Sequence, residues 1–163
     1  MKVRDIARLA IVCALYVGLT YIFSFASYGD IQFRISEILI LLCFFRKDYT
    51  ISLVLGTLLA NIGSPMGIVD VVFGTIATLL SCLSICFLKN LYLCMIPPVL
   101  FNGVIVGLEL HFILELELVP SMISVAIGEA AVMVVGIVLF TILKKNRTFM
   151  KMIDANRNYT FNE

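Results

Sequence analysis

The sequence has few charged residues, a single histidine and no pair of cysteines separated by two residues. Charged residues make up 14% of the chain, against about a quarter in an average soluble protein. The net charge of +1 gives no reason to expect a nucleic-acid partner. The five cysteines lie in apolar stretches away from His111, so we interpret them as small core residues and expect no metal site. The phosphate-binding pattern GxxxxGK[ST] is also absent, so any ATP-driven work requires a partner protein.

Hydrophobic residues are abundant instead. They account for 61% of the chain, and the mean hydropathy is +1.07. This composition predicts an all-α, polytopic integral membrane protein. At roughly 20 residues per crossing, the length allows about six helices with short loops and leaves no room for a soluble domain. We therefore expect residues 1–163 to form one six-helix transmembrane domain with no cofactor.

The apolar runs and the breaks between them locate the six helices. Pro97 and Pro98 predict a kink in the fifth, and an acidic connector is expected over residues 111–119. The first run, with Ser24-Phe25-Ala26 at its end, is also compatible with a cleaved secretory signal, but a retained helix is the preferred interpretation. A polar tail follows the last helix. The helices are expected over residues 9–26, 32–46, 49–62, 67–88, 91–110 and 120–144.

The basic residues predict the orientation. Eleven of the 12 Lys and Arg residues fall at the amino terminus, two alternate turns and the carboxy terminus, and Arg34 is the exception. By the positive-inside rule, both termini are cytoplasmic and the chain crosses the membrane six times. Seven of the 11 acidic residues lie toward the opposite, outer side: Asp30, Glu37, Asp70, Glu109, Glu115, Glu117 and Glu129.

Asp70 lies among aliphatic and aromatic residues after a turn containing Gly63, Pro65 and Gly67. A carboxylate at membrane depth is costly and is usually matched to a partner or a ligand, although Asp70 could instead cap a helix near the headgroups. Other polar residues accompany it in the outer half. We expect an externally open pocket for a small, flat ligand rich in hydrogen-bond donors, lined by Arg34, Glu37, Asn61, Asp70, Asn102 and Glu129 with the rings of Tyr28, Phe33 and Phe73.

Two alternatives concern smaller features. Arg34 and Glu37 are spaced i, i+3 and could simply pair with each other. Small residues at helical spacing in the first helix, Ala10 and Ala14 among them, allow close approach of another helix, which could belong to a partner or to the same bundle. The polar residues are confined to the outer half, which argues against a channel, and the lack of an internal repeat argues against an ordinary secondary transporter.

Several motifs together resemble one known family. They are Phe33-Arg34-Ile35-Ser36-Glu37, Ala60-Asn61, the run from Asp70 to Leu80, and Gly128-Glu129. This combination resembles the QueT family of substrate-binding S components, which serve the energy-coupling factor (ECF) importers of vitamins and related micronutrients. The resemblance covers nearly the whole chain.

The resemblance implies a function and partners. A six-helix S component of this kind captures a queuosine precursor, a 7-deazaguanine base, and delivers it with a transmembrane coupling protein and two cytoplasmic ATPases in a prokaryotic cell membrane. Ala10-Ile-Val-Cys-Ala14 resembles the AxxxA motif that docks on the coupling protein. An S component for another vitamin would share these features. A rival from another class is a membrane enzyme using Glu109, His111 and Glu115, although one histidine on an exposed loop cannot exclude water.

Overall fold

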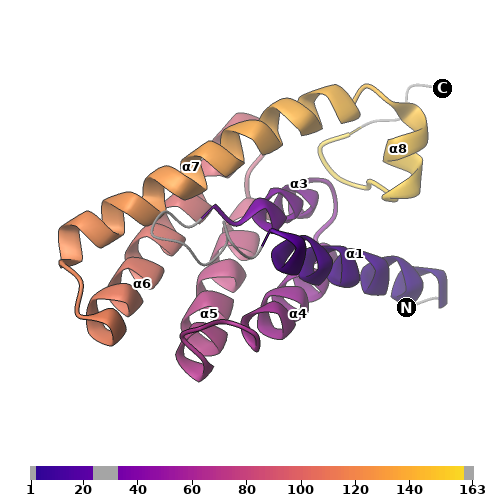
Figure 1. Cartoon of the computed structure of the whole chain (residues 1–163). Coiled ribbons are helices and arrows are strands. Elements are labelled where there is room, and N and C mark those ends of the chain that lie inside the picture. Colours follow the sequence, from indigo (N-terminus) through magenta and orange to yellow (C-terminus); the bar gives the residue numbers. More distant parts are fainter. Residues whose placement is uncertain (1–2, 24–32, 160–163) are drawn as a thin grey trace.

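The computed structural model describes residues 3–23 and 33–159, which form helices and no strand (Figure 1). The all-helical architecture expected from the sequence is confirmed for these residues. Two of the elements are 3-10 helices, labelled η1 and η2, and the others are α-helices. In chain order the elements are α1 (Val3–Ile22), η1 (Ile35–Leu41), α3 (Leu42–Phe45), α4 (Tyr49–Asn61), α5 (Ile68–Ile85), η2 (Leu91–Met95), α6 (Ile96–Leu114), α7 (Leu118–Leu143) and α8 (Arg147–Met152).

Four helical segments of the described chain are long and apolar enough to cross a membrane: Val3–Ile22, Ile68–Ile85, Leu91–Leu114 and Leu118–Leu143. The apolar segments Ile35–Phe45 and Tyr49–Asn61 are shorter. At 1.5 Å per residue, a helix of 13 residues extends about 20 Å, less than the roughly 30 Å hydrocarbon core of a bilayer. The structure therefore supports a membrane protein with four helices of spanning length, and the expected count of six is not confirmed.

The predicted end of the fifth helix and the predicted start of the sixth were wrong. The fifth helix continues through His111 to Leu114, so only residues 115–117 connect α6 to α7. Glu115 ends α6 in the left-handed backbone region, at φ 56°. Pro97 and Pro98 lie in the first turn of α6, where a missing N–H breaks no hydrogen bond of that helix, and the 3-10 helix η2 ends just before them. In the tail, Asn146 caps the short helix α8 by accepting hydrogen bonds from the backbone N–H groups of Thr148 and Phe149.

Helices α5 and α6 bury most of their small and polar residues and expose many of their large apolar ones. In α5 the buried face carries Asp70, Gly74, Thr78 and Ser81. Its exposed residues include Phe73, which is 46% exposed. This reversal of the soluble pattern is expected where lipid covers the outside, because tight packing and polar contacts then hold helices together. It also places the polar residues of the sequence inside the bundle.

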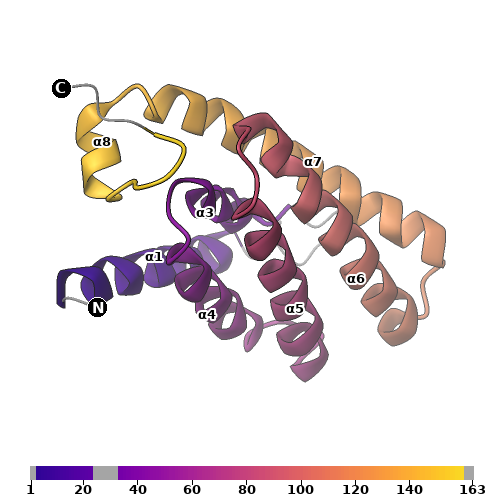
Figure 2. The ribbon, with the colours of Figure 1, turned by 180° about the vertical axis from the view of Figure 1, so that it is seen from behind.

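Helices α6 and α7 lie antiparallel along one side of the molecule (Figures 1 and 2). Their contact depends on Gly103 and Gly107, the two glycines of the GxxxG pattern. A Cβ atom added at Gly103 would lie 3.1 Å from the Cβ of Ala126, and one at Gly107 would lie 2.7 Å from the Cα of Met122. Larger residues at these positions would force the two helices apart.

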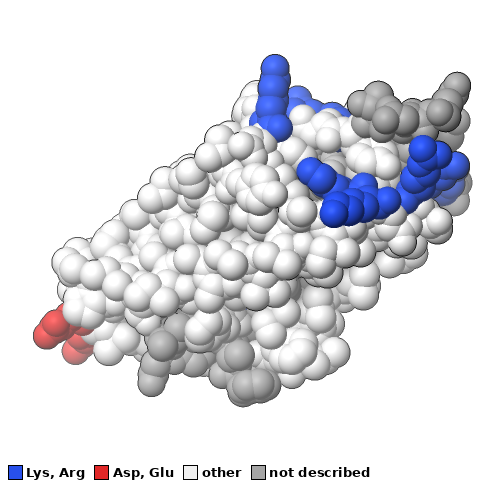
Figure 3. Space-filling model, turned by 90° about the horizontal axis from the view of Figure 1, so that it is seen from above, with Lys and Arg blue, Asp and Glu red and all other residues white. Residues whose placement is uncertain are grey.

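Four chain segments rich in basic residues meet at one end of the molecule. Arg8 of α1 and Arg46 after α3 both bond the side chain of Asp154, near the carboxy terminus. Asn158 donates to the carbonyls of Phe44 and Leu88, at 2.9 and 3.2 Å. Figure 3 shows the Lys and Arg side chains gathered toward this end and acidic ones at the other. We call it the basic end, and the opposite end the acidic end.

The apolar core lies toward the basic end. The ring of Phe45 stacks on that of Phe140 at 5.9 Å between centroids, and Phe140 contacts Phe149 edge-on at 6.1 Å. Tyr49, also buried, donates a hydrogen bond of 2.9 Å to the carbonyl of Ile153 and so attaches α4 to the tail. These aromatic residues pack the half of the bundle near the basic end, and the buried polar residues lie in the other half.

Candidate functional site

A buried ion pair joins the segment before η1 to the first turn of α5. Nη2 of Arg34 lies 3.0 and 2.9 Å from the two carboxylate oxygens of Asp70. Arg34 is 5% exposed and Asp70 is fully buried. Asp70 lies in the first turn of α5, as the capping alternative expected, but both of its carboxylate oxygens bond Arg34. The i, i+3 pair of Arg34 with Glu37 is not formed, because the guanidinium bonds Asp70 instead.

Asn61, the last residue of α4, connects that helix to the first turn of α5. Its side-chain amide donates to the backbone carbonyl of Asp70 at 2.8 Å. Gly74, one turn further along α5, lets these groups approach: a Cβ added there would lie 2.5 Å from Nδ2 of Asn61 and 2.8 Å from Oδ1 of Asp70. The absence of a side chain at Gly74 is therefore a condition for this arrangement.

Glu37 lies in η1 and is fully buried. One of its oxygens, Oε1, accepts a short hydrogen bond from the hydroxyl of Tyr16 in α1 and another, at 3.3 Å, from Thr78 in α5. A neighbouring bond of 2.7 Å joins Thr20 of α1 to Ser36 of η1. The carboxylate thus ties three elements together while leaving its second oxygen for another partner.

Asn102 of α6 and Glu129 of α7 complete the site. Both are buried, and Asn102 lies within hydrogen-bonding reach of Glu129. Together with Arg34, Val106 and Val125 they line a cavity of about 10 Å³. This is room for about one water molecule, whereas sites for small organic ligands occupy about 300–1,000 Å³. The cavity that these described residues line is therefore too small by itself for an organic ligand.

Most of the buried hydrogen-bond acceptors without a partner in this cluster are carboxylate oxygens. Among the described residues, Oε2 of Glu37, Oδ1 of Asn61, Oε1 of Glu129 and both oxygens of Glu109 are buried without a hydrogen-bond partner. Four acids, Glu37, Asp70, Glu109 and Glu129, are buried with Arg34 as the basic residue among them. Such a set of acceptors matches a ligand that brings several N–H donors or a positive charge.

The structure brings together six of the predicted site residues: Arg34, Glu37, Asn61, Asp70, Asn102 and Glu129. Tyr28 lies outside the described residues. Phe33 is half-buried and packs against the apolar core, while Phe73 faces outward on α5. The sequence analysis did not predict Tyr16, Gly74 and Thr78 as part of the site. It placed Glu109 toward the outer side but not in the pocket. Tyr16 and Thr78 were missed because nothing in the sequence distinguishes a hydroxyl in an apolar run that bonds Glu37 from one that faces lipid.

The residues proposed for a membrane enzyme do not come together. Glu109 is buried in α6, whereas Glu115 is exposed beyond the end of the helix. Nδ1 of His111 lies 2.6 Å from the carbonyl oxygen of Leu116. No group of three potential metal ligands occurs within the described part of the chain. This geometry provides no catalytic centre from these residues.

The small residues of α1 lie on its outer surface. Ala7, Ala10 and Ala14 are exposed, and a Cβ added at Gly18 would contact nothing within 4 Å. Among the described residues, the exposure of these three alanines favours the alternative in which the stripe faces a partner helix.

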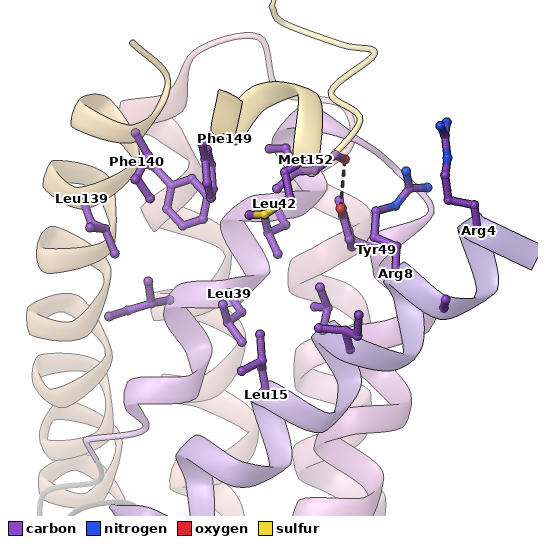
Figure 4. Close-up of a pocket in the computed structure, with 16 residues that line it drawn as sticks. Arg4, Arg8, Leu15, Leu39, Leu42, Tyr49, Leu139, Phe140, Phe149 and Met152 are labelled. Carbon is purple, nitrogen blue, oxygen red and sulfur yellow. Dashed lines mark hydrogen bonds between the residues drawn. The ribbon is translucent and has the colours of Figure 1, made fainter. Parts of the chain in front are cut away.

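Next to this surface, an apolar groove of about 430 Å³ lies between α1, α7 and α8 toward the basic end (Figure 4). Leu15, Leu39 and Leu139 line it, with Arg4 and Arg8 of α1 near α8. The polar cluster described above shares none of its lining residues, so the groove is separate from the candidate ligand site.

Comparison with known proteins gives one family. The family model described as QueT transporter matches residues 6–145. Among curated proteins, the queuosine precursor transporter QueT of Lactococcus lactis subsp. cremoris (strain MG1363) is 46% identical over 80 residues. The aligned stretch covers 48% of this chain and 47% of that protein, about half of each. No solved structure matches the chain.

Proposed function

The chain belongs to the QueT transporter family, and from this premise we propose that it binds a queuosine precursor, a 7-deazaguanine base such as 7-aminomethyl-7-deazaguanine. The family consists of transporters and not enzymes, and the apolar helices agree with a multi-pass protein of the cell membrane. The binding site of this proposal is the buried cluster of Arg34, Glu37, Asn61, Asp70, Asn102 and Glu129.

The observation that carries the proposal is the surplus of buried acceptors around the ion pair of Arg34 and Asp70. Arg34 is already bonded to Asp70, while oxygens of Glu37 and Glu129 have no partner among the described residues. Leaving charged groups buried without partners destabilises a protein strongly. A ligand that supplies donors compensates for this cost on binding.

A deazaguanine base has the matching groups. Its ring N–H and exocyclic amine are adjacent donors, which one carboxylate can accept together. Its carbonyl oxygen requires a donor, for which Arg34 and Asn61 are the candidates. A 7-aminomethyl substituent adds an ammonium group, which fits the excess of carboxylates over basic residues. Phe33, half-buried and next to Arg34 in the sequence, is the proposed ring for one face of the planar base.

We further propose that the protein is an S component of an ECF importer. In this proposal α1, the η1–α3 segment, α4, α5, the η2–α6 segment and α7 give six crossings, with the basic end and both termini in the cytoplasm. A transmembrane coupling protein and two cytoplasmic ATPases supply the transport energy. The exposed Ala10 and Ala14 of α1 are the proposed docking surface, since small residues allow a partner helix to approach closely.

Calorimetric titration of the purified protein tests the ligand. We expect binding of 7-deazaguanine bases and no binding of riboflavin or thiamine. Binding of one of these vitamins but not of the deazaguanines would reject the queuosine precursor and retain a vitamin-binding S component. Mass analysis of any ligand retained through purification provides an independent identification.

A further inference from the structure

Glu109 is a buried carboxylate whose role the cluster described above does not explain. It lies in α6 and is only 3% exposed. Both of its oxygens are buried without a hydrogen-bond partner among the described residues. Glu37 and Glu129 differ in this respect, because each has one oxygen of that kind and not two. An acid in this state requires a partner that the described chain does not provide.

The position of Glu109 places it beside the candidate site. It follows Asn102 by seven residues, two helical turns, and therefore lies on the same face of α6. Val106, midway between them, lines the small cavity with Arg34 and Glu129. Since α6 runs from η2, next to the basic end, toward the acidic end, Glu109 lies on the outer side of the cavity.

The described residues support neither of two structural roles for Glu109, an ion pair or a metal site. A structural ion pair would need a basic partner, and no salt bridge to Glu109 occurs among the described residues. A metal site would need at least two further ligands nearby, and the described chain contains no such group. A buried acid at membrane depth without such a partner is typical of a substrate site.

We infer that Glu109 is a ligand-binding residue that receives the positively charged amine of the substrate and so selects an amine-bearing base over an uncharged one. This rests on the proposed function. In 7-aminomethyl-7-deazaguanine the aminomethyl group is on the same side of the rings as the carbonyl oxygen, away from the ring N–H and exocyclic amine. Arg34 can therefore donate to the carbonyl while Glu109, on the outer side of the cavity that Arg34 lines, accepts from the ammonium. Glu129 and Asn102 remain for the opposite edge.

The first test uses the wild-type protein and three ligands: 7-aminomethyl-7-deazaguanine, 7-cyano-7-deazaguanine and 7-deazaguanine. We expect the amine-bearing base to bind about tenfold to a hundredfold more tightly than the two uncharged ones, the gain typical of one charge-assisted hydrogen bond. Equal affinity for all three would overturn the role of Glu109 while leaving the proposed function intact. Binding of none of them would reject the proposed function itself.

The second test is the substitution Glu109→Gln, which keeps the size of the side chain and removes the charge. We expect it to remove the preference: the affinity for the amine-bearing base falls about tenfold to a hundredfold, and that for 7-deazaguanine changes by less than about threefold. The matched control is Glu115→Gln, an exposed acid just beyond the same helix, which should leave both affinities unchanged.

A loss of affinity that is equal for charged and uncharged bases would show that Glu109 is structural. Thermal unfolding of each variant in detergent identifies misfolding. If Glu109→Gln does not fold, the variant Glu109→Asp, which retains the charge, takes its place. It should keep the preference for the amine-bearing base. Loss of that preference in folded Glu109→Asp would count against the inference.

Discussion

Nη2 of Arg34 donates to both carboxylate oxygens of Asp70, at 3.0 and 2.9 Å, across 36 residues of sequence. This ion pair connects the segment before η1 with the start of α5, in the half of the bundle nearer the acidic end. It also changes the role expected of Asp70. A carboxylate occupied in this way by Arg34 fixes the direction of the guanidinium more than it offers acceptors to a ligand.

Replacing Asp70 by Ala should therefore destabilise the protein. Arg34 would remain buried and lose its charged partner, which typically costs about 3–5 kcal/mol of folding free energy. The measurement is thermal or denaturant unfolding in detergent. Glu115→Ala, at an exposed position, is the control and should change stability little. An Asp70→Ala protein as stable as the wild type, but unable to bind a deazaguanine, would mean that Asp70 acts on the ligand directly.

The double substitution Arg34→Leu with Asp70→Leu tests the same pair in a second way. Since it leaves no unpaired charge, we expect it to destabilise the protein less than Asp70→Ala alone. Ligand binding should nevertheless be lost, because the proposed donor to the carbonyl oxygen is gone. Retained binding would exclude Arg34 from the site.

Gly74→Ala should disturb the site through a single methyl group. The added Cβ would lie 2.5 Å from Nδ2 of Asn61 and 2.8 Å from Oδ1 of Asp70, below ordinary contact distance. Overpacking of this kind typically costs about 1–3 kcal/mol. We expect lower stability in unfolding experiments and weaker ligand binding in calorimetry.

Gly18→Ala is the matched control for that substitution. Gly18 also lies inside a membrane helix, but nothing lies within 4 Å of a Cβ placed there. The change should be neutral or stabilise the protein by up to about 1 kcal/mol, since Gly is less favourable than Ala in a helix. Equal effects at both positions would show that the contact at Gly74 is unimportant.

The sequence predicted the class of fold, and it singled out polar residues that the structure brings together, for a physical reason. Hydrophobic composition reports directly on the lipid environment, and charged or amide residues such as Asp70, Glu129 and Asn102 stand out against an apolar background. Pairing could not be predicted in this way. The choice of Asp70 rather than Glu37 as the partner of Arg34 depends on how η1 packs against α5, which no local spacing encodes.

Helix ends were predicted less well than helix centres. His111 to Leu114 continue α6 although His111 is polar, and α7 begins before Pro120, because tertiary packing and the first-turn tolerance of proline decide the boundary. The short segments η1–α3 and α4 were expected as full crossings. Their expected bounds, 32–46 and 49–62, were already short for a crossing, and α4 ends at Asn61, one residue before its expected end.

Asp154 should make the stability of the basic end depend on pH. The hydrogen bond from Arg8 lowers the pKa of Asp154 below its ordinary value of 3.8, partly offset by burial and assisted by the charge of Arg46. Because the pKa is lower in the folded protein, this stabilisation is present above the ordinary pKa and is lost as the pH falls through the folded-state value.

We therefore expect Asp154→Asn to reduce the stability difference between neutral pH and acidic pH. The measurement is thermal unfolding in detergent over about pH 2 to 6, the range in which a paired aspartate loses its contribution. Asp48, which also bonds Arg46 but shows more exposure, gives the comparison variant Asp48→Asn. An unchanged pH profile in Asp154→Asn would assign the effect to other acids.

Ala10→Leu combined with Ala14→Leu tests the proposed docking surface. Both alanines are exposed, so the larger side chains should be accepted without loss of folding or ligand affinity. Association with the coupling protein should weaken, since a partner helix could no longer approach α1 closely. Co-purification is the measurement, and Val3→Leu, on the same helix at an exposed position, is the control. Undiminished co-purification would place the partner elsewhere.

The last prediction concerns the side of the membrane that the basic end occupies. The contacts of Asp154 with Arg8 and Arg46, and of Asn158 with the carbonyl of Leu88, hold four basic segments at one end. The positive-inside rule then requires that they lie together in the cytoplasm. In a cysteine-free protein, a cysteine at Lys89 should be labelled by an impermeant reagent only after the cells are opened. A cysteine at Glu117, at the acidic end, should be labelled in intact cells. Labelling of Lys89→Cys from outside would invert the orientation and, with it, the proposal that the substrate enters at the acidic end.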